Sequence, residues 1–186
     1  MLGSKEIEAD FEFTWSVLTD FFGQRRIQRT LDAIHGTEVS GWEKWWQVEL
    51  ALYLSDHPEV GSWNMEERFF TDRRRCSTND SMAIDLCFRR KRCSKDSMIY
   101  LELKQDAEWK RCMENMLRDA VKVFQAQTRS HEGASMRSFF VAGIYPSIAK
   151  VEVHDYVEKR LDELEIDWDV MDTKFISSTP YGLTMF

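Results

Sequence analysis

Two short runs of alternating apolar and polar residues constrain the fold of this chain more than any other feature. They cover residues 82–88 (Met-Ala-Ile-Asp-Leu-Cys-Phe) and 98–104 (Met-Ile-Tyr-Leu-Glu-Leu-Lys). Such alternation is typical of half-buried β-strands, in which side chains two residues apart project to the same face of the sheet. The residues between the runs are polar, so we expect an antiparallel hairpin whose loop is centred near Cys93 and Ser94.

Three ionisable side chains fall on one face of this predicted hairpin. With that loop centre, Asp85 lies directly opposite Glu102, and directly opposed residues project to the same face. Lys104 follows two residues later on the same side. Two opposed carboxylates repel each other unless a cation lies between them, so the arrangement predicts a metal site. The other face is apolar and contains Ile84, Leu86, Phe88, Ile99, Leu101 and Leu103.

Length and composition indicate one domain with a sizeable core. The chain has 186 residues, of which 43% are hydrophobic. We expect a helical extension over residues 1–41, a core over 42–145, and a helix and strand addition over 146–186. Since no apolar run approaches the length of a membrane span and the charged start lacks a secretory apolar stretch, we expect a cytoplasmic protein that does not associate with a membrane.

Several other classes of site lack support in the sequence. No P-loop or Gly-rich dinucleotide motif occurs, so we expect no intrinsic use of ATP. The four cysteines have no CxxC spacing; Cys87 and Cys112 lie in apolar patterns and are expected to be core thiols. A zinc site made by Cys76, Cys93 and a histidine is the alternative to free thiols.

The remaining patterns predict an α/β order of elements. Helices are expected over residues 4–34 (two helices, broken at Gly23), 42–54, 106–128 and 147–164. Further strands are expected over residues 65–72 and 138–145, with one or two more within 168–178. Three aromatic residues of the first helices have two interpretations, as core or as a dimer contact: Trp15, Phe21 and Phe22.

One acidic residue of the helix predicted over residues 42–54 has an unusual setting. Glu49 has only apolar or aromatic residues three and four positions away: Trp45, Trp46, Leu52 and Tyr53. Burying an unpaired charge is unfavourable, so this carboxylate needs a partner. One interpretation is a salt bridge, and the other is a third acid that a helix brings to the metal site.

Taken together, these residues resemble the PD-(D/E)XK nuclease superfamily. Its restriction-endonuclease-like core is a helix, a three-stranded antiparallel meander, a helix and a fourth strand. Asp85 matches the family's acid in the second strand, residues 102–104 (Glu-Leu-Lys) match the acid-x-Lys element, and Glu49 matches the glutamate that many members have on the first core helix. The similarity covers about residues 42–145 and departs at Ile84, where the family name has proline.

The resemblance implies a nuclease that hydrolyses DNA with Mg²⁺ or Mn²⁺, for which hard oxygen ligands are suited. It implies Asp85 and Glu102 as the principal ligands, the backbone carbonyl of Leu103 as a third, and Glu49 as a ligand through water or to a second ion. Lys104 would orient the attacking water or stabilise charge in the transition state, and an ion pair with Glu102 is compatible with either role.

Two basic clusters flank the hairpin and are candidates for contact with the phosphate backbone. Such contacts supply most of the sequence-independent affinity for nucleic acid, although loops also carry charge simply for solubility. Arg73, Arg74 and Arg75 end the first strand at the end of the sheet where the acid-x-Lys element lies, so we expect them to bind DNA. The second cluster, residues 89–92 with Lys95, is expected at the opposite end. Gln105 would bind a phosphate or begin the next turn.

We therefore expect a Mg²⁺-dependent endonuclease that acts on DNA in defence, repair or recombination, with RNA as an alternative substrate for the same site. A homodimer or a protein partner would suit so small a chain. The alternative from another class is a non-catalytic acidic interaction or inhibitor protein on the same scaffold, which the net charge of −7 would fit. Only the enzyme requires Asp85, Glu102 and Lys104 around a cation.

Overall fold

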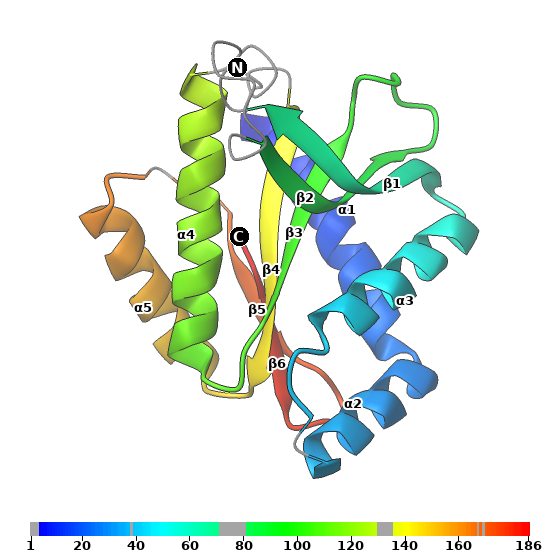
Figure 1. The fold of residues 1–186 in the computed structure, drawn as a ribbon, viewed down its shortest axis with the longest axis vertical. Coiled ribbons are helices and arrows are strands. Elements are labelled where there is room, and N and C mark those ends of the chain that lie inside the picture. The colour runs from blue at the N-terminus through cyan, green and yellow to red at the C-terminus, as the bar shows by residue number, and fades with distance from the viewer. Residues whose placement is uncertain (1–3, 38, 71–80, 130–135, 167, 169) are drawn as a thin grey trace.

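The computed structural model describes residues 4–37, 39–70, 81–129, 136–166, 168 and 170–186, which form an α/β structure with five helices and a mixed six-stranded sheet. The strands lie in the order β1-β2-β3-β4-β6-β5 (Figure 1). All neighbouring strands are antiparallel except β3 and β4, which are parallel and are joined through α4. The elements are α1 (Ser4–Gly23), α2 (Arg25–Thr37), α3 (Glu43–Asp56), β1 (Val60–Phe70), β2 (Ser81–Arg90), β3 (Ile99–Gln105), α4 (Trp109–Arg129), β4 (Ser138–Pro146), α5 (Lys150–Glu163), β5 (Asp172–Phe175) and β6 (Tyr181–Met185).

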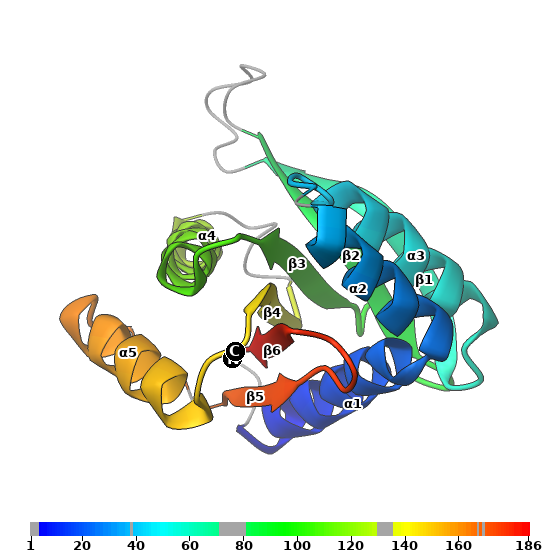
Figure 2. The ribbon, with the colours of Figure 1, turned by 90° about the horizontal axis from the view of Figure 1, so that it is seen from below.

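Helices cover both faces of the sheet. The first three helices lie on one side and α4 and α5 on the other (Figure 1, Figure 2). Trp46 and Leu50 of α3 pack in one core cluster with Leu101 of β3, whereas Met116 of α4 packs in a second cluster with Val141 of β4. Because β4 is buried on both faces, its sequence is a continuous apolar run rather than an alternating one. No helix of the described residues is long and apolar enough to cross a membrane.

Most predicted elements are present, with three corrections. The first strand begins at Val60, five residues before its predicted start; Gly61 lies at a shift in the pairing register, and this irregularity breaks the alternating pattern there. The tail has a second strand, β6, beyond the predicted range. Ile84 packs in the cluster of α4, whereas Leu86 and Phe88 pack in that of α3, so the apolar residues of β2 are divided between two core clusters.

The aromatic and cysteine side chains with open interpretations lie mainly in the core. Phe21 and Phe22 are almost fully buried, which favours a core role over a dimer contact, and Trp15 is partly buried against the same cluster. Cys87 and Cys112 are buried free thiols, as predicted. Cys76 lies outside the described residues.

One glycine controls how closely α4 approaches the sheet. A Cβ added to Gly143 of β4 would lie 2.3 Å from Met116 Sδ and 2.9 Å from Cys112 Sγ. Gly143 is also the register partner of Lys104 on the neighbouring strand β3. The position of α4 beside Lys104 therefore depends on the absence of a side chain at residue 143.

We predict that Gly143→Ala lowers the free energy of unfolding by about 1–3 kcal/mol, because the added methyl group overpacks the contact with α4. Urea unfolding with an unchanged m-value would measure the loss. The matched control is Gly36→Ala in α2, where nothing lies within 4 Å of the added Cβ. That substitution should leave stability unchanged or raise it by up to about 1 kcal/mol. Equal effects of the two substitutions would contradict the close approach.

Candidate active site

The predicted opposition of Asp85 and Glu102 is present in the structure. The pairs of β2 and β3 are Leu86 with Leu101, Cys87 with Tyr100 and Phe88 with Ile99. This register, continued by one residue, places Asp85 opposite Glu102. Side chains replace the backbone ladder at that point: the Leu103 N–H donates to Asp85 Oδ2 at 2.9 Å, and the Asp85 N–H donates to Glu102 Oε2 at 3.4 Å.

Lys104 lies beside Glu102 and is held between two carboxylates. Its Nζ donates to Glu102 Oε1 at 2.7 Å and lies 2.9 Å from Asp119 Oδ2 of α4. Asp119 also pairs with the exposed Lys122, one turn further along the helix. Asp119 was not among the predicted site residues, and it links the acid-x-Lys element to α4.

The third acid of the cluster is Glu43, in the first turn of α3. Its Oε2 accepts a hydrogen bond from the Gln105 N–H at 3.1 Å. One helical turn later, the buried Gln47 donates from Nε2 to the Asp85 carbonyl at 2.8 Å. These two contacts join α3 to both strands of the motif and bring the Glu43 carboxylate to the acids.

Glu49, the residue predicted to be this third acid, lies elsewhere. Its Oε2 forms an ion pair with Arg26 Nη2 of α2 at 2.6 Å, which is the salt-bridge interpretation. The hydrogen bond from Arg26 lowers the pKa of Glu49. Glu49 follows Glu43 by six residues, and at 3.6 residues per turn this places the two side chains about 120° apart around the helix. Of these two acids, only Glu43 lies on the side of the helix that faces the strands.

Burial and mutual repulsion make the acids of the cluster reluctant to ionise. Burial, followed by the charge of Asp85, raises the pKa of Glu102 to about 7. Burial also raises the pKa values of Asp85 and Glu43. For Lys104, burial lowers the pKa, but the charges and hydrogen bonds of Glu102 and Asp119 outweigh it and the net shift is upward. The cluster therefore has more buried acid than neighbouring ammonium can neutralise.

The donor set fits a hard divalent cation. In the part of the chain that the structure describes, no three Asp, Glu, His or Cys side chains form a ready-made metal group. Instead, the oxygens of Asp85 and Glu102 accept bonds from backbone N–H groups and from Lys104. Carboxylate and carbonyl oxygens are the ligands that Mg²⁺ and Mn²⁺ prefer, and a cation would relieve the repulsion between the buried acids.

The other predicted site residues lie in different settings. The Leu103 N–H points into the gap between β2 and β3, and in a strand the carbonyl of a residue projects to the same side as its N–H. Gln105 is the last residue of β3, and its backbone binds Glu43. Arg73, Arg74 and Arg75 lie outside the described residues.

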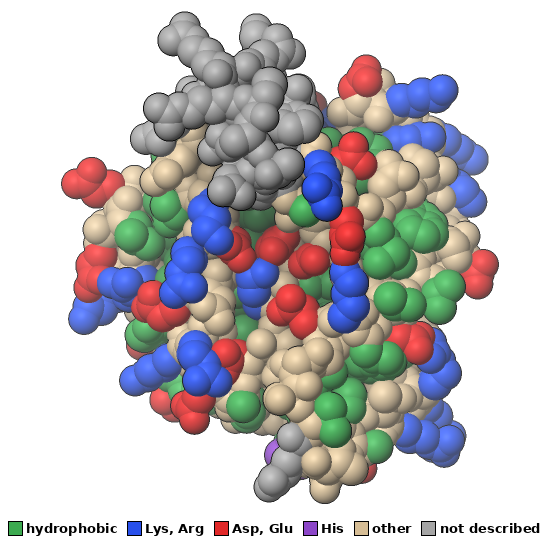
Figure 3. All heavy atoms as spheres, in the orientation of Figure 1, with side chains coloured by type: hydrophobic (Ala, Val, Ile, Leu, Met, Phe, Trp, Pro, Cys, Tyr) green, Lys and Arg blue, Asp and Glu red, His purple; other side chains and the backbone are tan. Residues whose placement is uncertain are grey.

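Basic side chains border the acidic cluster on two sides. In the orientation of Figure 1, Figure 3 shows Asp and Glu side chains gathered near the centre, with Lys and Arg side chains along α4 and beside α3. On α4 the exposed residues Arg111, Arg118 and Lys122 recur at intervals of seven and four residues, which places them on one stripe of the helix. Lys44 of α3 is exposed on the other side and pairs with Glu66.

The two missed acids had a signal in the sequence. Glu43 precedes Gln47 by four residues and Leu50 by seven, so it extends the buried stripe of α3. Asp119 follows Met116 by three residues, at the margin of the buried stripe of α4. A carboxylate that continues the apolar stripe of a helix therefore indicated a residue of the acidic cluster better than a carboxylate with aromatic neighbours did.

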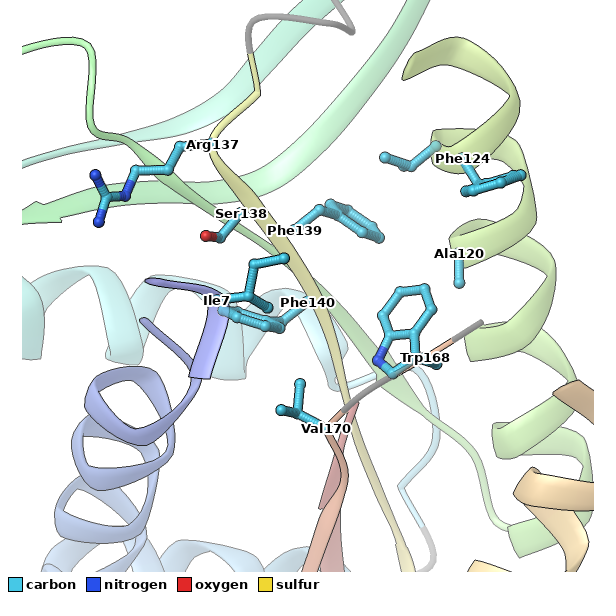
Figure 4. Close-up of a pocket in the computed structure, with 10 residues that line it drawn as sticks. Ile7, Ala120, Phe124, Arg137, Ser138, Phe139, Phe140, Trp168 and Val170 are labelled. Carbon is cyan, nitrogen blue, oxygen red and sulfur yellow. The ribbon is translucent and has the colours of Figure 1, made fainter. Parts of the chain in front are cut away.

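A separate cavity of about 170 Å³ lies between α4, the start of β4 and α1, and none of the acids of the cluster lines it. Its walls are mainly apolar and include Phe124, Phe139 and Trp168 (Figure 4). The polar ends of Arg137 and Ser138 point away from these rings and donate to the carboxylate of Asp10. This cavity therefore presents no group suited to catalysis among the described residues.

Comparisons of the chain with models of protein families, with curated proteins and with solved structures found no match. A functional assignment therefore depends on the positions and charges of the residues described above. Their arrangement places three acids and one ammonium at the junction of β2, β3 and α3, with α4 beside them.

We predict that Glu102→Gln stabilises the metal-free protein at pH 8 by about 1–3 kcal/mol. Because the folded-state pKa of Glu102 is raised to about 7, its contribution to stability is present at low pH and is lost as the pH rises through that value. The advantage of the glutamine should therefore shrink toward pH 5. Urea unfolding in EDTA across this range would measure it.

Glu49→Gln is the matched control for that experiment. The pKa of Glu49 is lowered by Arg26, so removal of this charge should slightly reduce stability at pH 8. A pH-independent effect of Glu102→Gln, or one with the opposite sign, would show that the surroundings of Glu102 do not raise the pKa of its carboxyl group.

Proposed function

We propose that this chain is a metal-dependent nuclease of the PD-(D/E)XK type that hydrolyses phosphodiester bonds of DNA. In this proposal, the segment from α3 to β4 is a restriction-endonuclease-like core, and α1 and α2 are additions. The order of elements supports it: a helix, three antiparallel strands, a helix, and a fourth strand parallel to the third.

One observation carries the proposal. Asp85 and Glu102 oppose each other across β2 and β3, and Lys104 lies on the same face with its Nζ 2.7 Å from Glu102. Glu43 adds a third carboxylate from a helix. Repelling acids at a sheet interior reduce stability, so their convergence is better explained by a cation-dependent reaction than by a structural role.

The acids would hold the metal ion. Asp85, Glu102 and the Leu103 carbonyl would be its ligands, and Glu43 would bind it through water or hold a second ion. A bound Mg²⁺ or Mn²⁺ would lower the pKa of a water molecule and neutralise charge that develops on the phosphate and the leaving oxygen.

Lys104 would act on the attacking water or on a phosphate oxygen. An ammonium has three N–H donors, and Glu102 and Asp119 together account for two of them. The remaining donor can orient a water molecule or stabilise negative charge in the transition state. Asp119 would position Lys104, because it fixes the direction of the side chain from the opposite side.

The basic borders of the cluster support a polyanionic substrate. Arg111, Arg118 and Lys122 on α4 and Lys44 on α3 flank the acids. Lysine and arginine contacts to phosphates supply most of the non-specific affinity of DNA-binding proteins. RNA would meet the same side chains, so it belongs among the substrates to be assayed.

We predict metal-dependent cleavage of supercoiled plasmid that falls about 100-fold or more in Asp85→Asn and in Lys104→Ala. The structure adds a sharper comparison: Glu43→Gln should also reduce cleavage strongly, whereas Glu49→Gln should not. The assay would compare plasmid, single-stranded DNA and RNA in Mg²⁺, Mn²⁺ or EDTA.

Two results would argue against the proposal. Cleavage that is unchanged in Asp85→Asn and Lys104→Ala would come from another source. An absence of cleavage on every substrate, without any effect of metal on stability, would favour the non-catalytic interaction protein. If Glu43→Gln cleaves as well as Glu49→Gln does, the nuclease would stand but Glu43 would not belong to its site.

We also predict that Mg²⁺ or Mn²⁺ raises the melting temperature of the wild type but not of Asp85→Asn. An ion that binds only the folded state stabilises it by mass action, by about 2.7 kcal/mol at 100 times its dissociation constant. Thermal melts in a metal titration would measure this shift, with Glu49→Gln as the control that keeps it. A shift that persists in Asp85→Asn would place the binding elsewhere.

A further inference from the structure

An open hollow of about 300 Å³ adjoins the acidic cluster on the sheet. Residues from all three strands of the antiparallel part and from the β2–β3 hairpin line it: Ser62, Asn64, Glu67, Cys87, Arg89, Lys95, Met98 and Tyr100. Its volume is at the lower end of the range for small-molecule sites. It is therefore large enough to hold part of a larger molecule, such as one unit of a polymer.

The hollow and the acids share one face of the sheet. Cys87 follows Asp85 by two residues on β2, and Tyr100 precedes Glu102 by two residues on β3. Cys87 and Tyr100 are also register partners. The hollow thus begins two residues along each strand from the opposed acids, a distance of about 7 Å. A polymer that runs from the acids along β2 and β3 toward the hairpin would pass directly over it.

The second basic cluster contributes to this hollow. Sequence alone placed residues 89–92 and Lys95 at the end of the sheet opposite to the acids, away from the substrate. In the structure, Arg89 and Lys95 line the hollow on the face of the acids. Arg89 Nη1 donates to the Cys93 carbonyl at 3.1 Å and to the Arg90 carbonyl at 3.4 Å, and these bonds orient the guanidinium. Among the described residues its other nitrogens make no hydrogen bond, so they can bind a ligand.

The lining chemistry suits an unpaired nucleotide. Arg89 and Lys95 can bind a phosphate, and the ring of Tyr100 offers a surface for base stacking. Asn64 can donate to and accept from a base edge. Bases inside a duplex are stacked and paired, so only an unpaired base can present its face to a side chain in this way. Glu67 also lines the hollow and disfavours a phosphate on its own side.

We propose that this hollow binds an unpaired nucleotide next to the cleaved bond, so that the substrate is single-stranded nucleic acid or the single-stranded part of a longer one. This inference rests on the proposed nuclease function, since the hollow is assigned to the substrate because it lies beside the proposed catalytic acids. In this proposal, the single strand of nucleic acid runs from the acids over Cys87 and Tyr100 toward Arg89 and Lys95.

Binding of a fluorescent single-stranded oligonucleotide, measured by anisotropy in Mg²⁺, tests the proposal. The Asp85→Asn background prevents the proposed catalytic site from cutting the probe. Lys95→Ala should weaken binding and reduce the slope of log K against log salt by about 0.7, the value for one lost phosphate contact with a single strand. Lys91→Ala is the matched control, because Lys91 lies in the same hairpin, is exposed and does not line the hollow.

A second pair of variants tests the stacking surface. Tyr100→Leu should weaken single-strand binding about fivefold or more, whereas Tyr100→Phe keeps the ring and should restore it. A duplex probe should respond to neither substitution. Since Lys95 is exposed, Lys95→Ala keeps the proposal testable even if Tyr100→Leu does not fold.

The outcomes separate this proposal from the nuclease itself. If the wild type cuts DNA with metal but Lys95→Ala and Lys91→Ala bind the single strand equally, the hollow is not a binding site and the nuclease stands. The hollow is likewise excluded, and the nuclease kept, if duplex and single-stranded probes respond alike. If nothing is cut but Lys95→Ala and Tyr100→Leu selectively weaken single-strand binding, the hollow is confirmed and the catalytic proposal fails.

Discussion

The pairing register of β2 and β3 is the constraint on which the candidate site depends. Leu86 pairs with Leu101 and Phe88 with Ile99, and these four side chains lie in the core cluster of α3. A slip of one residue would turn them toward the other face and bring the acids into the core. Burial of apolar side chains therefore holds the register, and the register in turn places Asp85 opposite Glu102.

Backbone donors of β3 then stabilise the acids where the two strands separate. Beyond Leu101, the N–H groups of Leu103 and Gln105 point to the side of β2 but bind side chains, Asp85 and Glu43 respectively. Two carboxylates thus replace the backbone carbonyl groups that would accept these hydrogen bonds from a paired strand. Hydrogen bonds from N–H groups partly offset the burial of these charges, but burial, followed by the charge of Asp85, still keeps the pKa of Glu102 high, and the cluster retains an excess of acid. The same excess is what makes the cluster suited to a cation.

The prediction of the hairpin and the prediction of the helical acid had different outcomes for a physical reason. A strand has a period of two, and a hairpin relates its two strands through a single loop, so Asp85 and Glu102 could be aligned from sequence alone. A helix offers many directions, and Glu49 points to Arg26 of α2 instead of to the sheet. Its aromatic neighbours indicated burial without indicating which partner. Glu43, by contrast, lies on the stripe that reaches the strands. The start of the first strand was also predicted too late, because pairing with β2 extends this strand through the irregular position Gly61.

The faces of the two motif strands, their register and hence the group of Asp85, Glu102 and Lys104 could all be derived from the order of the residues. They follow from periodicity over neighbouring positions and from burial of the apolar face. The addition of Glu43 and Asp119 to this group, and the border that Arg89 and Lys95 make around the hollow, emerged only from the folded chain. Those positions depend on how α3 and α4 dock on the sheet and on how far the hairpin extends. Docking is a property of packing between distant segments, such as the close contact at Gly143, and no local pattern in the chain specifies it.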